Sequence, residues 1–298
     1  MQATLFSVSY AGLWGQGRLS LEEFVPHARI LGYGSIEIMG KRPHLSPLDW
    51  DEARVRGLAA LCADEGVEVD CVAAYTHWLA GASAAEVPLV EMQLQYVEAL
   101  ARAAAILSCP LVRVFTAYER GDLPPAVQWN RTVTALQECC DRAAVHGVSI
   151  GIQNHHDLAV HSQALAELYR DIDRPNLRLM LDPWSICLRS EDPSAMARTM
   201  APLVAYTTLA DYVRLPRYRY RPELINYEVA GPDLVRAVPL GEGEMDNLGF
   251  LRGLQAGGYD GHVAYEMCSP LRGGGSMENL DRTARQALAW LQENGFSR

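Results

Sequence analysis

Carboxylates stand at the ends of two apolar runs in this sequence. Glu266 interrupts the run VAYEM, and Asp182 ends the run LRLMLDP. Burying a carboxylate costs several kcal/mol unless the group is paired or bound to a metal. Two carboxylates that converge from different strands can hold a hard divalent cation or share acid and base roles. The structural alternative for each is a salt bridge to an arginine or a capped turn.

The run GIQNHHDLAVHS is the most polar of these strand ends. His155 and His156 are adjacent, so their side chains point in different directions and at most one is expected to face a shared site. We interpret one of them as a functional residue, an acid or base opposite Glu266. A hydrogen-bonded structural histidine is the alternative.

Other polar and aromatic residues occur at comparable places and are expected to contact a substrate. They are Glu37, His77, Trp184, Thr208, Asp211 and Arg217. Aromatic residues are as often part of the core as of a pocket wall. Arg217 belongs to the run RLPRYRYR, and arginine suits a phosphate or carboxylate on a substrate. Pairing of these arginines with carboxylates of the same chain or of a second subunit is the alternative.

One structural unit recurs eight times and positions these residues: a short apolar run, a loop and an amphipathic stretch. The expected strands are Leu5–Ser9, Ser35–Met39, Glu68–Ala74, Leu111–Thr116, Val148–Gln153, Leu177–Leu181, Val204–Leu209 and His262–Met267. The expected helices lie near 20–31, 49–65, 87–107, 125–146, 161–172, 194–201, 246–257 and 278–294.

Eight strand–helix units predict parallel strands closed into a (β/α)8 TIM barrel, with residues 1–298 as one domain. In such a barrel the carboxyl ends of the strands meet at one mouth, which brings the polar strand ends together. Ser20, Asp192 and Asp246 are helix-start signals, and Gly66 stands where a helix should stop. An open doubly wound sheet is the alternative, although no G-x-G-x-x-G follows the first strand.

A long segment after the seventh strand interrupts the regular alternation of strands and helices. Residues 211–244 far exceed the usual connection between strand and helix. We interpret this segment as a long loop that acts as a lid over the barrel mouth. A structural insertion or a dimer contact is the alternative.

Composition limits the partners. The 298 residues carry a formal net charge of −10, which disfavours binding to a phosphate backbone. The seven cysteines form no C-x-x-C pair, so neither a disulfide framework nor a thiolate zinc site is indicated. No apolar run approaches the ~20 residues that span a bilayer, and the first residues lack the basic region of a secretory signal. We expect a cytoplasmic protein that binds neither nucleic acid nor membrane, with a homo-oligomer and a single chain both left open.

The strand ends resemble those of the sugar isomerases and epimerases with a xylose isomerase-like TIM barrel. This family includes tagatose 3-epimerase-like enzymes, inosose dehydratases and related apurinic endonucleases. The resemblance covers essentially the whole chain, and its most specific parts are Q-N-H-H-D, L-M-L-D-P and Y-E-M. It implies a divalent metal held by Glu, Asp, His and Glu from strands five to eight, with two of these glutamates acting as acid and base.

Two of the four implied ligands match, namely Asp182 and Glu266. Gln153 stands where the family has its first glutamate, and Thr208 begins the segment that replaces H-x-K-D. Glutamine can ligate a metal through its amide oxygen but accepts no proton at neutral pH. The resemblance therefore implies Gln153, Asp182 and Glu266 as ligands of Mn, Mg or Zn, or else a metal-free site that uses a histidine opposite Glu266.

These observations predict an isomerase or epimerase of a sugar or keto-sugar derivative that removes a proton next to a carbonyl. A lyase or dehydratase that starts with the same step is the first alternative. A non-catalytic barrel with a degenerate metal site is another. An endonuclease acting at abasic sites is disfavoured, because the family's many His and Glu metal ligands are lacking and the net charge is adverse.

Overall fold

Eight parallel strands form a closed barrel in the computed structural model, which describes residues 1–82, 86–155 and 157–297. The strands are β1 (Gln2–Phe6), β2 (Ser35–Met39), β3 (Glu68–Ala73), β4 (Leu111–Val114), β5 (Ser149–Gln153), β6 (Leu177–Leu181), β7 (Val204–Leu209) and β12 (His262–Tyr265). Their order around the barrel follows the chain, and β1 pairs with both β2 and β12 to close it. The predicted fold is confirmed.

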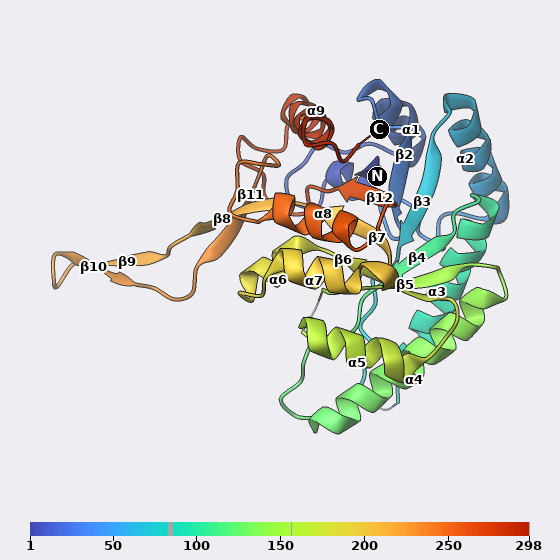
Figure 1. The fold of residues 1–298 in the computed structure, drawn as a ribbon, viewed down its shortest axis with the longest axis horizontal. Coiled ribbons are helices and arrows are strands. Elements are labelled where there is room, and N and C mark those ends of the chain that lie inside the picture. The colour runs from blue at the N-terminus through green and yellow to red at the C-terminus, as the bar shows by residue number, and fades with distance from the viewer. Residues whose placement is uncertain (83–85, 156, 298) are drawn as a thin grey trace.

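Helices follow the barrel strands, and most contact their neighbours around the outside (Figure 1). They are α1 (Leu21–Ile30), α2 (Glu52–Glu65), α3 (Leu89–Ile106), α4 (Pro125–Ala144), α5 (Ser162–Ile172), α6 (Pro183–Leu188), α7 (Pro193–Met200), α8 (Asn247–Ala256) and α9 (Met277–Glu293). The predicted start signals are confirmed: Ser20 forms a capping box with Glu23, and Asp192 and Asp246 accept first-turn N–H groups. Gly66 ends α2 in the left-handed conformation.

The barrel strands are buried along almost their whole length, because helices cover the outside and side chains fill the inside. The prediction for β1 is three residues too late. There the apolar run continues into a short 3-10 helix, Ser7–Tyr10, whose residues are also buried. The short helix α6, directly after β6, is a feature that the sequence reading does not separate from the following loop.

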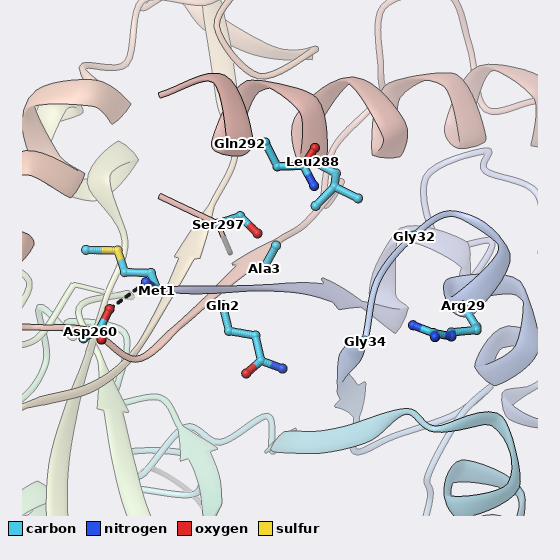
Figure 2. A pocket seen from close by; sticks show the side chains of 10 residues that line it. All are labelled: Met1, Gln2, Ala3, Arg29, Gly32, Gly34, Asp260, Leu288, Gln292 and Ser297. Carbon is cyan, nitrogen blue, oxygen red and sulfur yellow. Dashed lines mark hydrogen bonds and ion pairs between the residues drawn. The ribbon is translucent and has the colours of Figure 1, made fainter. Parts of the chain in front are cut away.

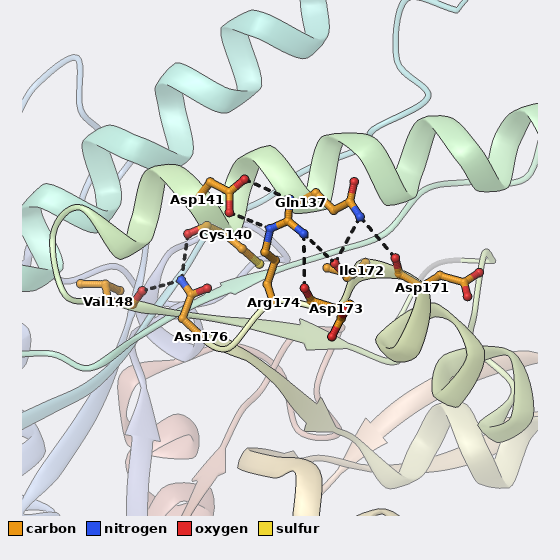
Figure 3. Close-up of polar contacts among 9 residues, drawn as sticks. All are labelled: Gln137, Cys140, Asp141, Val148, Asp171, Ile172, Asp173, Arg174 and Asn176. Carbon is orange, nitrogen blue, oxygen red and sulfur yellow. Dashed lines mark hydrogen bonds and ion pairs between the residues drawn. The ribbon is translucent and has the colours of Figure 1, made fainter.

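The start of β6 is anchored on α4, which fixes where this strand ends (Figure 3). Arg174 donates to both carboxylate oxygens of Asp141, at 2.7 and 3.2 Å. Asn176 donates through its side-chain amide to the Cys140 and Val148 carbonyls, at 2.8 and 3.1 Å. Since β6 is only five residues long, these contacts also set the position of Asp182 at its other end.

The segment after β7 is an arm of four short strands rather than a loop, which corrects the sequence-based interpretation of its local structure. Its strands are β8 (Asp211–Leu215), β9 (Tyr218–Arg221), β10 (Asn226–Val229) and β11 (Leu234–Val238). β8 pairs antiparallel with β11, and β9 with β10. The arm extends away from the barrel, with the β9–β10 turn at its far end (Figure 1). Arginine and tyrosine alternate over residues 217–221, which is typical of a strand. Because the arm projects away from the barrel, it does not support the interpretation as a lid.

Candidate active site

Asp182 lies directly after β6 and forms the N-cap of α6. Its Oδ1 accepts the Ser185 backbone N–H at 2.8 Å, and its Oδ2 accepts the Gln153 side-chain amide at 3.2 Å. The carboxylate is fully buried. Burial raises its pKa to about 7, although these hydrogen bonds favour the charged form. Asp182 thus combines a capping role with a place inside the barrel mouth.

Gln153, the last residue of β5, forms hydrogen bonds to residues on β4 and β7 and to Asp182 at the end of β6. Its Nε2 donates to Asp182 and to the Thr208 hydroxyl, both at 3.2 Å, and its Oε1 accepts from Arg113 Nη1 at 3.0 Å. Because a guanidinium only donates, the amide oxygen must face it. The oxygen that was expected to ligate a metal is therefore occupied by a cation from this chain.

Arg113, on β4, is the site residue that sequence reasoning missed. Its side chain is only 2% exposed, and its guanidinium carbon lies 4.0 Å from the centre of the Phe115 ring and 4.8 Å from that of Tyr75. The signal was present, since an arginine interrupts the apolar run LVRV as a glutamate interrupts VAYEM. A buried guanidinium stays charged, so the site contains a permanent positive charge.

Glu266 follows β12 and is 6% exposed. Its side chain forms no ion pair or hydrogen bond within the part of the chain that the structure describes. Burial, followed by repulsion from Glu37, raises its pKa well above the usual range, while Arg113 opposes the shift. Repulsion from Asp182 also contributes, which places the two carboxylates in one electrostatic environment.

Glu37 lies two strands from Glu266, across β1. Phe6 pairs with Glu37 on one side, and on the other the pair Leu5–Tyr265 brings Glu266 beside Phe6. Both Glu37 carboxylate oxygens are buried without a hydrogen-bond partner among the described residues. Burial raises the Glu37 pKa to about 8, against the attraction of Arg113, so this carboxyl group is largely protonated at neutral pH.

Aromatic rings and His155 border this cluster. The His155 ring centre lies 4.9 Å from that of Phe115 and 6.4 Å from that of Trp184. Burial and the Arg113 charge lower the pKa of His155 to about 4, so its imidazole is neutral at pH 7. His156 lies outside the described residues. His77 accepts the Tyr118 backbone N–H at 3.2 Å, and its ring packs edge-on against the Tyr118 ring.

Two of the expected substrate-binding residues lie in the arm or at its base. Asp211 accepts the backbone N–H groups of Gly241, Gly243 and Met245 at 2.9 to 3.2 Å, which ties β8 to the segment after β11. Arg217 is exposed between β8 and β9 on the projecting arm (Figure 1). The structure therefore does not bring Arg217 to the site of its own chain, because the paired strands carry it away from the barrel.

The cavity shown in Figure 2 lies at the opposite end of the barrel. It measures about 380 Å³ and is lined by residues at the start of β1, by Asp260 and by the end of α9. The Met1 amino group binds the Asp260 carboxylate there at 2.7 Å. Active sites in such barrels lie at the carboxyl ends of the strands, so we assign this opposite end to stability.

The implied divalent metal does not fit these residues. Within the described ranges, no three His, Cys, Asp or Glu side chains are grouped so that they could hold a metal ion. Both Asp182 oxygens accept hydrogen bonds, and the Gln153 oxygen faces Arg113. A divalent cation here would also meet the repulsion of a buried guanidinium.

The fold and these strand ends define a TIM barrel with a charged, largely buried site at its carboxyl-terminal mouth. A sequence model of the xylose isomerase-like TIM barrel family matches residues 25–294, and the chain belongs to this family. A search of curated proteins finds no match.

Solved structures share the fold over nearly the whole chain. The D-psicose 3-epimerase from Clostridium cellulolyticum H10 has a TM-score of 0.75 at 15% identity, and all of both chains is covered. The probable 3-DHS dehydratase from Bacillus anthracis has a TM-score of 0.74 at 17% identity, covering 98% of this chain and 99% of that one. An L-ribulose 3-epimerase has a TM-score of 0.73 at 19% identity, covering 99% and 94%.

No helix among the described residues is both long and apolar enough to cross a membrane.

Proposed function

We propose that this chain is an enzyme that removes a proton next to a carbonyl group of a sugar or keto-sugar derivative, with Glu266 as the base. The observation that carries the proposal is a buried carboxylate with a raised pKa and no bound partner in the described chain, at the barrel mouth. A carboxylate whose pKa is raised above its ordinary value is a stronger base than an exposed glutamate.

The surrounding residues favour isomerisation over epimerisation. A single carboxylate can take a proton from one carbon and return it to the next on the same face of the substrate. Inversion at one carbon needs a second proton carrier on the opposite face, and the neutral amide of Gln153 stands where the resemblance implies one. A lyase is the second candidate, because loss of a β-substituent starts with the same proton transfer and a similarly folded protein is a probable 3-DHS dehydratase.

Protonated Glu37 and neutral His155 have supporting roles in this proposal. At neutral pH the Glu37 carboxyl group donates a hydrogen bond to a substrate oxygen. The His155 and Trp184 rings, whose centres are 6.4 Å apart, supply an apolar surface to the site in this proposal. A small polyhydroxylated molecule matches such a mixture of apolar rings and buried polar groups.

Exchange of substrate hydrogen with solvent tests the proposal without knowledge of the product. The protein is incubated in D2O with D-psicose, D-tagatose, L-ribulose and 3-DHS, and proton NMR follows the hydrogen next to each carbonyl. We expect exchange with at least one compound and a loss of at least about 100-fold in Glu266→Gln, with no fall in the melting temperature. The exposed Glu68→Gln is the control. Undiminished exchange in Glu266→Gln would overturn the assignment, and no exchange with any compound would favour a non-catalytic barrel.

We also propose that the arm, residues 214–236, packs against a second copy of this chain. Its large apolar side chains are between 40% and 83% exposed: Leu215, Tyr218, Tyr220, Leu224, Ile225, Tyr227, Val229, Leu234 and Val235. Two-stranded sheets are at best marginally stable in water, and an exposed apolar patch of this kind marks an interface.

Charge favours a second copy of this chain as the partner of the arm. Five arginines and three acidic residues give the arm a formal charge of +2, so the rest of the chain, at −12, is strongly acidic. A basic arm on an acidic protein is complementary to the body of an identical chain. Arg217 and Arg219 then contact the partner rather than a substrate bound in their own barrel.

A further inference from the structure

The buried guanidinium of Arg113 lies against the Tyr75 and Phe115 rings, and no carboxylate of the described residues pairs with its charge. Its Nε and Nη2 atoms have no hydrogen-bond partner among the described residues, and Nη1 has only the neutral Gln153 amide. No carboxylate of the described chain lies within ion-pair distance of it. Buried charges are normally paired, because the loss of hydration is otherwise uncompensated. These free donors therefore mark a place for an acceptor that the chain itself does not supply.

The complementary feature is Glu37, whose two carboxylate oxygens are also buried without a partner. Cys71, beside it on β3, offers only a weak S–H donor. Arg113 and Glu37 act on each other electrostatically without touching. A ligand that fits between them presents an acceptor oxygen to the guanidinium and a hydroxyl or second oxygen to the carboxyl group.

We propose that Arg113 is the resident cation of this barrel and, with Glu37, binds the carbonyl oxygen and neighbouring hydroxyl of an α-hydroxy carbonyl substrate in place of a divalent metal. This inference rests on the proposed function for the reaction and on the contacts of Arg113 for the site. It explains why Gln153 stands where the resemblance implies a glutamate. It also explains why the amide oxygen of Gln153 faces Arg113 on β4. A neutral amide accepts from a guanidinium while leaving the positive charge unneutralised for the substrate.

The step that Arg113 assists is a balanced proton transfer. The Glu266 carboxylate forms a bond to the substrate hydrogen as the C–H bond breaks, and the electron pair moves into a carbon–carbon double bond. The former carbonyl oxygen then carries the negative charge, and the free N–H groups of Arg113 donate to it. Return of the proton to the former carbonyl carbon, with transfer of the hydroxyl proton between the two enediol oxygens, leaves the carbonyl group on the carbon that first lost its hydrogen. No oxidant or reductant is needed.

Manganese binding tests whether Arg113 takes the place of a metal. Two variants restore the acidic and imidazole positions: Gln153→Glu/Thr208→His, and the same pair with Arg113→Met added. Titration with Mn²⁺ alone is followed by electron paramagnetic resonance, and circular dichroism verifies folding. We expect no stoichiometric binding by the natural sequence, and binding at least about 100-fold tighter in the triple variant than in the double one. Should the triple variant not fold, Arg113→Gln replaces Arg113→Met in the same comparison.

Stoichiometric Mn²⁺ binding by the natural sequence would overturn the proposal. Equal affinity of the folded double and triple variants would overturn it too, because the guanidinium would then have no influence on a cation in this place. Neither result depends on turnover, so failure of the proposed reaction and failure of this inference are distinguishable.

Ligand binding provides the second test. Glycolohydroxamate has a planar pair of oxygens that resembles an enediolate, and calorimetry in the presence of EDTA measures its affinity without metal. We expect binding by the natural sequence, a loss of about 30-fold in Arg113→Met and a smaller loss in Arg113→Lys, which keeps the charge but not the planar donors. Absent binding, or an Arg113→Met affinity within threefold of the natural one, would contradict the role of Arg113.

Discussion

Glu37 has a proposed role in substrate binding and also lowers the stability of the fold at high pH. Its carboxyl group is enclosed by the barrel, with neither oxygen hydrogen bonded among the described residues. Since burial raises the pKa to about 8, the folded state retains a proton that the unfolded chain has released above its ordinary pKa of 4.5. The folded state binds more protons, so this residue makes the free energy of unfolding fall as pH rises between these two values.

The substitution Glu37→Gln should remove that dependence. We expect the variant to gain on the order of 4 kcal/mol of stability over the natural sequence at pH 8, and much less at pH 5, because glutamine cannot ionise. Urea unfolding at both pH values measures the difference. The exposed Glu293→Gln is the control. A gain at pH 5 as large as that at pH 8 would show that the carboxyl group does not titrate in the folded barrel.

At the scale of elements, the junction between β7 and β8 decides where the barrel ends and the arm begins. Asp211 receives backbone N–H groups from the segment that returns to the barrel after β11. A Cβ atom at Gly243 would overlap the Asp211 carboxylate, so this close approach requires glycine. The polar strand end that suggested substrate binding thus serves to fix the base of the arm.

Removal of this carboxylate should loosen the arm. We expect Asp211→Ala to lower the free energy of unfolding by about 2–4 kcal/mol, because several N–H groups lose their acceptor, and Asp211→Asn to lower it less. Limited proteolysis should also cut sooner near residues 238–245. The exposed Asp233→Ala, on the arm itself, is the matched control. Equal stability of Asp211→Ala and Asp233→Ala would contradict this structural role.

At the scale of the whole molecule, the arm predicts self-association. Tyr220 and Tyr227 face each other across β9 and β10, with ring centres 5.2 Å apart, and both are exposed. We expect light scattering to give at least twice the mass of one chain for the natural sequence and a lower mass for Tyr220→Ser/Tyr227→Ser. Higher salt should weaken the assembly, because the proposed contact is partly electrostatic.

The control for this prediction is Leu48→Ser, which removes an apolar side chain that is 82% exposed on the barrel. Its mass should equal that of the natural sequence. A single-chain mass of the natural protein across the concentration range would contradict the docking of the arm on a second copy.

The sequence by itself determined the barrel, because eight repeats of an apolar run followed by an amphipathic stretch leave little choice of architecture. It also placed Asp182, Gln153 and Glu266 at strand ends that share a mouth. It did not reveal the role of Arg113, since the strands are buried on both faces and show no alternation that tells inward from outward residues.

Only the tertiary structure decided which partners these residues have. The direction of the Gln153 amide depends on Arg113, which is 40 positions away in the sequence. The arm likewise depends on pairing between strands 19 to 27 residues apart, from Leu234–Leu215 to Val238–Asp211. Such contacts arise when the chain closes, because hydrogen bonds and buried charges depend on distances in space that local sequence patterns do not encode.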